Sequence, residues 1–148
     1  MFEKLNYITL SGVKYPIKCD LVVIEKIQDK YGDLSDYENK LNGFYPAVDE
    51  NGEYKRNEEG KILGLYGEPS ISILKEALNW MVEEGMEIAR EEGEDTPSID
   101  GVNLIRKVDL APRELSEILH DEFARCFERK NPKTTQGKTA ETMKDSDE

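Results

Sequence analysis

The apolar residues that follow Ser70 constrain the fold of this chain more than any other segment. They recur at intervals of three or four residues: Ile71, Leu74, Leu78, Met81, Gly85 and Ile88. This spacing places them on one face of an α-helix, and further apolar residues flank that face: Ile73, Ala77, Trp80 and Ala89. A stripe this wide is typical of a central core helix. Glycine inside a helix costs ~1 kcal/mol relative to alanine, so we expect a neighbouring element to approach closely at Gly85.

Two shorter helices are predicted before this segment. The first follows Asp20, a good N-cap, and ends at Gly32, where a glycine can supply the exit conformation. Its apolar positions are Val23, Ile24, Ile27 and Tyr31. The second is expected to begin at Ser35, with Glu38 completing a capping box, and to end near residue 43.

Two further helices are predicted after the central one. Apolar residues at 102–108 indicate a short helix that follows a polar loop. Asp109 is expected to cap the last helix, Pro112 fits its first turn, and Pro132 ends it. One face of this helix is apolar: Leu115, Ile118, Leu119, Phe123, Cys126 and Phe127.

Two regions have β character. Residues 7–10 and 14–18 are rich in β-branched and aromatic side chains on either side of Ser11-Gly12, which predicts an N-terminal hairpin. Residues 44–68 contain several turn signals and short apolar runs, which indicates a small irregular β insertion. We expect Asn51-Gly52 to form a type I′ turn within it.

These elements predict a mainly α (α+β) fold. The helical domain covers 1–129, including the hairpin and the 44–68 insertion, and the polar residues 130–148 are predicted to be a disordered tail. Seven residues are expected to be buried together in the core: Ile24, Leu74, Leu78, Met81, Ile88, Leu119 and Phe123. The chain of 148 residues is long enough to bury such a core.

The formal net charge of −12 narrows the possible partners. A field of this sign repels phosphate backbones and anionic membranes, so we expect neither nucleic acid nor a membrane as partner. Cys19 and Cys126 belong to no CxxC motif or Cys/His cluster, and the sequence begins without the apolar run of a signal peptide. We therefore expect two buried or half-buried thiols in a reducing cytoplasm.

Catalytic and metal motifs are incomplete, so no cofactor, metal site or enzymatic activity is predicted. Gly137-Lys138-Thr139 resembles the end of a phosphate-binding loop, but Pro132 stands where that motif needs glycine. Asp49, Asn51 and Glu53 alternate as the ligands of a calcium loop do, but Tyr54 stands where that loop needs glycine. His120 is the single histidine and has Ala124 one turn later, so a metal site or a catalytic base with its orienting partner is not indicated.

The most unusual feature is the acidic segment from Met81 to Asp100, which holds eight acidic residues and one basic residue, Arg90. It can be a solvated face that maintains solubility, or a surface that attracts a basic segment of another protein. The second interpretation assigns five candidate partner-binding residues: Glu83, Glu84, Glu87, Glu91 and Glu92.

Three segments resemble the tail assembly chaperones of long-tailed phages and prophages. Residues 7–17 (YITLSGVKYPI) are similar to the opening hairpin of that family, and residues 20–33 to the helix that follows it. Residues 77–85 (ALNWMVEEG) are similar to its central helix. The resemblance covers most of residues 7–128. It implies a non-catalytic, cytoplasmic protein in the bacterial host that binds the tape-measure protein and keeps it soluble during tail assembly.

Two further hypotheses accompany this resemblance. An alternative from another functional class is an acidic inhibitor that mimics DNA, although such mimicry needs carboxylates spread along an extended surface.

The family is often made in two lengths by ribosomal frameshifting, and Arg129-Lys130-Asn131 can be encoded by the slippery run A AAA AAC. Other codons at these positions, or no open −1 frame, would exclude slippage at this site.

Overall fold

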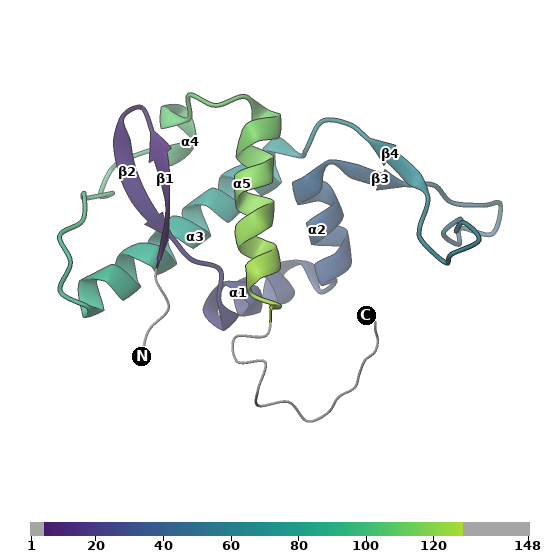
Figure 1. Ribbon diagram of the computed structural model, residues 1–148, viewed down its shortest axis with the longest axis horizontal. Coiled ribbons are helices and arrows are strands. Elements are labelled where there is room, and N and C mark those ends of the chain that lie inside the picture. The colour runs from purple at the N-terminus through teal and green to yellow at the C-terminus, as the bar shows by residue number, and fades with distance from the viewer. Residues whose placement is uncertain (1–4, 129–148) are drawn as a thin grey trace.

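The computed structural model describes residues 5–128, and this part of the chain is mainly helical with two small antiparallel hairpins (Figure 1). The elements in chain order are β1 (Asn6–Leu10), β2 (Val13–Ile17), α1 (Leu21–Tyr31), α2 (Leu34–Asn42), β3 (Phe44–Pro46), β4 (Gly64–Tyr66), α3 (Ile71–Glu91), α4 (Leu104–Lys107) and α5 (Pro112–Arg125). The predicted mainly α fold with an N-terminal hairpin is therefore confirmed. The predicted tail and the slip site lie outside the described residues.

The N-terminal hairpin pairs β1 with β2, from Asn6 opposite Ile17 to Leu10 opposite Val13. Ser11 and Gly12 both have positive φ, at 49° and 81°, as a two-residue type I′ turn requires. The Ser11 hydroxyl donates to the carbonyl of Lys107 at 2.6 Å. This contact fixes the tip of the hairpin to the end of α4.

Gly85 is the point where β2 crosses α3. A Cβ atom at Gly85 would lie 2.5 Å from the carbonyl carbon of Pro16 and 2.8 Å from the nitrogen of Ile17. Just beyond the crossing, Lys18 N donates to the carbonyl oxygen of Met81 at 3.0 Å. The expected close approach at Gly85 is confirmed, and the approaching element is β2.

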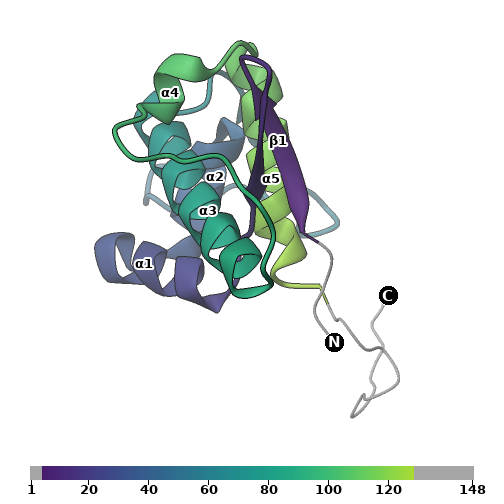
Figure 2. The same ribbon diagram turned by 90° about the vertical axis from the view of Figure 1, so that its left-hand side faces the viewer.

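The core is one cluster to which the N-terminal hairpin and all five helices contribute. α3 runs behind α5 in Figure 1, and Figure 2 shows the hairpin beside both helices. Six of the seven predicted core residues are buried: Ile24, Leu74, Leu78, Met81, Leu119 and Phe123. The prediction for Ile88 is wrong, because its side chain is half-buried. Val82, Met86 and Ala89 are buried in that part of α3 instead.

Two predicted helix caps are also wrong. α2 is capped by Asp33, whose carboxylate accepts from Ser35 N at 2.9 Å. α5 begins after Ala111 instead of Asp109, and the Glu114 carboxylate accepts from Ala111 N at 2.9 Å. The cap at Asp20 is confirmed, with its carboxylate accepting from Val22 N and Val23 N at the start of α1.

Residues 44–67 form an arm that projects from the helical body at the right of Figure 1. Its stem is the β3–β4 pair, and isolated bridges join Val48 to Tyr54 and Arg56 to Ile62. Where these three pairs meet, backbone hydrogen bonds run in a circle: Ala47 N to Leu63 O, Leu63 N to Lys55 O, and Lys55 N to Ala47 O. The arm is therefore an ordered three-way junction of short hairpins, and the prediction of a small β insertion is confirmed.

The two tips of the arm have the same turn chemistry. The Asp49 carboxylate accepts from Asn51 N and Glu53 N, and the side-chain oxygen of Asn57 accepts from Glu59 N and Lys61 N. Gly52 and Gly60 have positive φ, at 80° and 84°, whereas Asn51 does not. A type I′ turn requires positive φ at both central residues, so the predicted type I′ turn at Asn51-Gly52 is wrong.

Candidate partner-binding surface

The five predicted glutamates lie along the second half of α3 and at its C-cap, but they do not share one face. Because an α-helix has about 3.6 residues per turn, Glu83, Glu87 and Glu91 form a row, with Glu84 beside it. Glu92, the C-cap residue, falls on the opposite side. The structure therefore brings four of the five residues together and separates the fifth.

Weak ion pairs hold part of this row. Lys26 Nζ of α1 lies 3.9 Å from Glu83 Oε1, and the side chains are 42% and 54% exposed. Arg90 pairs with Glu87 on the same helix, again with both side chains exposed. Exposed pairs of this kind contribute roughly 0–1 kcal/mol. A basic segment of another protein could replace Lys26 and Arg90 at little cost.

Glu84 differs from its neighbours because it is half-buried beside Asp20. Burial, followed by the hydrogen bond and the charge of the Asp20 carboxylate, raises the pKa of Glu84 to about 7. Asp20 cannot move away easily, because it caps α1 through Val22 N and Val23 N. The carboxyl of Glu84 is therefore partly protonated at neutral pH, and the negative charge of the surface depends on pH.

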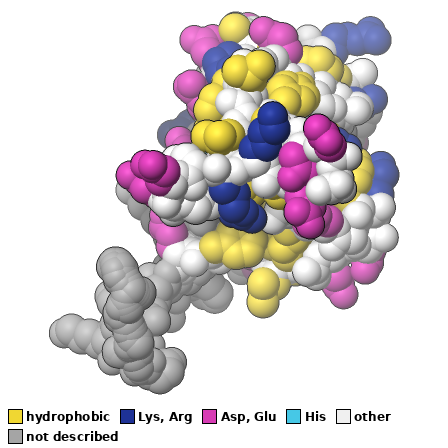
Figure 3. All heavy atoms as spheres, turned by 90° about the vertical axis from the view of Figure 1, so that its right-hand side faces the viewer, with side chains coloured by type: hydrophobic (Ala, Val, Ile, Leu, Met, Phe, Trp, Pro, Cys, Tyr) yellow, Lys and Arg dark blue, Asp and Glu magenta, His cyan; other side chains and the backbone are white. Residues whose placement is uncertain are grey.

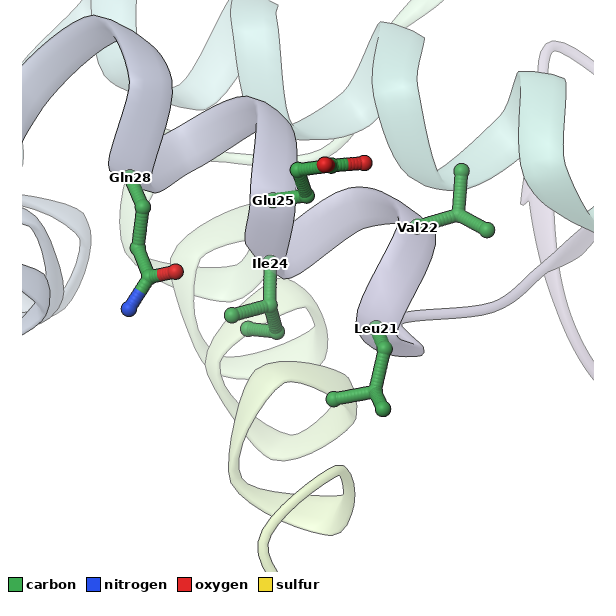
Figure 4. A pocket seen from close by; sticks show the side chains of 5 residues that line it. All are labelled: Leu21, Val22, Ile24, Glu25 and Gln28. Atoms are coloured by element: carbon green, nitrogen blue, oxygen red, sulfur yellow. The ribbon is translucent and has the colours of Figure 1, made fainter.

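An exposed apolar side chain, Val22, lies next to the acidic row. Leu21 and Val22, which directly follow Asp20, are 78% and 47% exposed. Val22 is one helical turn before Lys26, so it shares the side of α1 that faces Glu83. In Figure 4, Leu21, Ile24 and Gln28 project to one side of α1, and Val22 and Glu25 to another. These five residues line a shallow hollow of about 430 Å³.

We define the α1–α3 surface by its apolar and acidic members: Val22, Glu83, Glu84, Glu87 and Glu91. Sequence reasoning identified the acids but missed Val22 and the exposed Leu21 that precedes it. Their signal was present in the sequence, because they are apolar yet lie outside the helical stripe formed by Val23, Ile24 and Ile27. The surface combines hydrophobic area with negative charge, as a site for a basic amphipathic helix requires.

Glu92 takes part in a different group. Its charge and that of Glu94 act on Tyr7 of β1, whose hydroxyl donates to Glu94 Oε1 at 3.1 Å. Partial burial, followed by the hydrogen bond and charge of Glu94, raises the pKa of Tyr7. Glu94 therefore joins the loop after α3 to the N-terminal hairpin, and Glu92 lies beside this contact.

A buried carboxylate was also missed by sequence reasoning. Glu122 of α5 is 1% exposed, and it accepts hydrogen bonds from Asn6 Nδ2 at 2.9 Å, Cys19 N at 3.1 Å and Arg125 Nε at 3.2 Å. These bonds compensate for the cost of burying the charge. They join both ends of the N-terminal hairpin to α5, so we assign Glu122 a structural role.

The arm carries a second group of exposed large apolar side chains: Tyr45, Val48, Tyr54, Leu63, Leu65 and Tyr66. Figure 3 shows the side of the molecule from which the arm projects, with hydrophobic side chains in patches between acidic and basic ones. At the base of the arm, Arg113 of α5 donates to the carbonyls of Asn42 and Gly67. Arg113 thereby fixes the stem of the arm to the helical body.

No group of His, Cys, Asp and Glu residues within 5–128 could hold a metal ion. His120 Nε2 instead contacts Glu38 Oε2 of α2 at 2.8 Å, and Asp49 caps a turn. Within the same residues, no helix is both long and apolar enough to span a membrane.

Searches of protein-family models, curated proteins and solved structures find no match to this chain.

Proposed function

We propose that the chain is a non-catalytic assembly chaperone that holds a basic, helical segment of another protein on the α1–α3 surface. The observation that carries this proposal is the row of Glu83, Glu87 and Glu91 beside the exposed Val22. The apolar face of an amphipathic helix would cover Val22, and its lysine or arginine side chains would pair with the glutamates.

The proposed client is the tape-measure protein of a phage tail, in the cytoplasm of the bacterial host. This choice rests on the resemblance of residues 7–17, 20–33 and 77–85 to tail assembly chaperones. A long helical protein presents many amphipathic segments, and covering them would keep it from aggregating. The net charge of −12 supports a protein partner with basic segments over nucleic acid or an anionic membrane.

The geometry favours this role over DNA mimicry. A mimic needs carboxylates spaced along an extended surface, whereas these acids follow one side of one helix. Val22 gives the surface an apolar part that a DNA duplex does not present, and Lys26 and Arg90 already pair with two of the acids. A change at Val22 therefore separates the two roles.

The test is co-expression with a long, helical tape-measure protein, followed by pull-down and binding kinetics. We expect the triple change Glu83→Gln, Glu87→Gln and Glu91→Gln to slow association and to weaken its salt dependence. The matched control neutralises three exposed acids at the tips of the arm, Glu50, Glu58 and Glu59, and should bind as the wild type does.

A second variant tests the apolar part of the surface. Val22→Ser should weaken the complex mainly by faster dissociation, because it removes apolar contact with the client without changing charge. Unchanged client binding in both variants would contradict the proposed site. Binding that depends on the acids alone, with a DNA-binding protein as the captured partner, would favour the mimic.

A further inference from the structure

The two cysteines of the chain meet in the fold although more than a hundred residues separate them. Cys19 lies between β2 and α1 and is 1% exposed, and Cys126 is the C-cap residue of α5 and is half-buried. Cys126 packs against the core cluster that contains Cys19, and its thiol is close enough to raise the pKa of the Cys19 thiol. The backbone supports this placement independently, because Cys19 N donates to Glu122, one helical turn before Cys126.

We propose that Cys19 and Cys126 form a reversible intramolecular disulfide when the protein meets a disulfide oxidant such as oxidised glutathione. This bond would join the junction between the N-terminal hairpin and α1 to the end of α5. The proposal goes beyond the holding of a client and does not depend on it.

The surroundings of the two thiols set the order of the reaction. Burial, followed by the neighbouring Cys126 and Glu122, raises the pKa of the Cys19 thiol. Cys19 therefore stays protonated and is shielded from solution, whereas Cys126 is partly accessible. The thiolate is the reactive form, so Cys126 is the thiol that meets the oxidant first.

The reaction then follows ordinary thiol–disulfide exchange. The Cys126 thiolate attacks one sulfur of oxidised glutathione, the bond between the two glutathione sulfurs breaks, and one glutathione leaves. The Cys19 thiol then gives up its proton, its thiolate attacks Cys126 Sγ in this mixed disulfide, and the second glutathione leaves. The two protein thiols lose two electrons, glutathione disulfide gains them, and the protons of the two thiols end on the two departing glutathiones.

The disulfide would strengthen an existing contact between the hairpin–α1 junction and the end of α5. Glu122, one helical turn before Cys126, accepts from Cys19 N, so this side of α5 already packs against the junction that carries Cys19. The closed loop would include most of the chain, and a long loop restricts the unfolded chain strongly. Oxidation should therefore stabilise the native state and resist separation of the hairpin from α5.

The experiment treats the full chain with oxidised glutathione and measures the intact mass with and without a reductant. We expect a monomer that has lost the mass of two hydrogen atoms, carries no glutathione and returns to its starting mass with dithiothreitol. Its melting temperature should exceed that of the reduced protein by roughly 10 °C.

Two single variants separate the steps. Cys19→Ser should stop at a stable glutathione adduct on Cys126, because the resolving thiol is gone. Cys126→Ser should remain unmodified, because Cys19 is buried. The proposal is overturned if the wild type accumulates the same stable adduct as Cys19→Ser, forms only intermolecular dimers, or keeps both thiols under conditions that modify Cys126 in Cys19→Ser. The first two readings need only the wild type, so they stand even if a variant fails to fold.

Discussion

Glu84 is both an acidic residue of the α1–α3 surface and a partly buried side chain. It belongs to the acidic row by sequence, yet its half-buried position beside Asp20 raises the pKa of its carboxyl from 4.5 to about 7. The native state therefore holds a proton on Glu84 in a pH range where the unfolded chain has lost it. By linkage, the free energy of unfolding contributed by this group is greatest below pH 4.5 and falls as pH rises to about 7.

Replacement of Glu84 by glutamine should remove this dependence. We expect Glu84→Gln to be more stable than the wild type at pH 8, where wild-type Glu84 is charged beside Asp20, and to differ less at pH 5. Urea denaturation at the two pH values measures the effect. Glu83→Gln is the control, since Glu83 is exposed beside Lys26. An equal effect of Glu84→Gln at both pH values would contradict the assigned interaction with Asp20.

Other residues show where local sequence stops being informative. Asp33 and Ser35 are both good N-caps, and the carboxylate of Asp33 takes the role that the capping-box pattern gave to Ser35. Glu122 is a stronger case, because Asn6 and Cys19, its partners, are more than a hundred positions away. A single sequence without that long-range pairing shows only a glutamate on a helix.

Among the elements, α3 is the most predictable, and its error is instructive. Its period and its tight crossing at Gly85 follow from the sequence. The three-to-four-residue apolar spacing predicts Ile88 in the core. In that part of the helix, however, the buried residues are Val82, Met86 and Ala89. The N-terminal hairpin packs on α3 in addition to the other helices. The buried face of α3 is therefore wider than the apolar stripe in its sequence, and in its second half this face is turned away from Ile88.

The crossing of β2 over α3 leads to a prediction for Gly85. Alanine is the better helix former by ~1 kcal/mol, but a Cβ here would press on the backbone of Pro16 and Ile17. Backbone in a paired strand cannot move as the end of a flexible side chain can. We therefore expect Gly85→Ala to lower the free energy of unfolding by about 1–3 kcal/mol.

Chemical denaturation compares this variant with Lys75→Ala, which introduces the best helix former at an exposed position of the same helix. The control should be neutral or slightly stabilising. A more stable Gly85→Ala would show that the hairpin can move off α3, contrary to the assigned packing.

At the scale of the whole molecule, different sequence signals determine the structures of the helical body and of the arm. Hydrophobic periodicity predicts the helices of the body and most of their buried residues. The arm has no such pattern: its three pairs are joined by side-chain caps at the turns and a circle of backbone hydrogen bonds. Turn signals were enough to predict an insertion but not the arrangement of its hairpins, because each hydrogen bond of the circle joins segments that no local rule pairs.

This division predicts that the arm can be shortened without loss of the fold. No residue from 47 to 63 is buried, and Pro46 and Gly64 are already partners in the β3–β4 pair. Replacing 47–63 by Asn-Gly should therefore leave a short hairpin and a melting temperature close to that of the wild type, as measured by circular dichroism. A larger excision that also removes Gly67 should be destabilising, because Arg113 then loses an acceptor at the base of the arm.

The acidic half of α3 lies at the other end of the body from the arm (Figure 1), so the shorter variant should also keep its client affinity. A large fall in melting temperature would place the arm within the cooperative core, and lost client binding at full stability would move the binding surface to the exposed tyrosines and leucines of the arm.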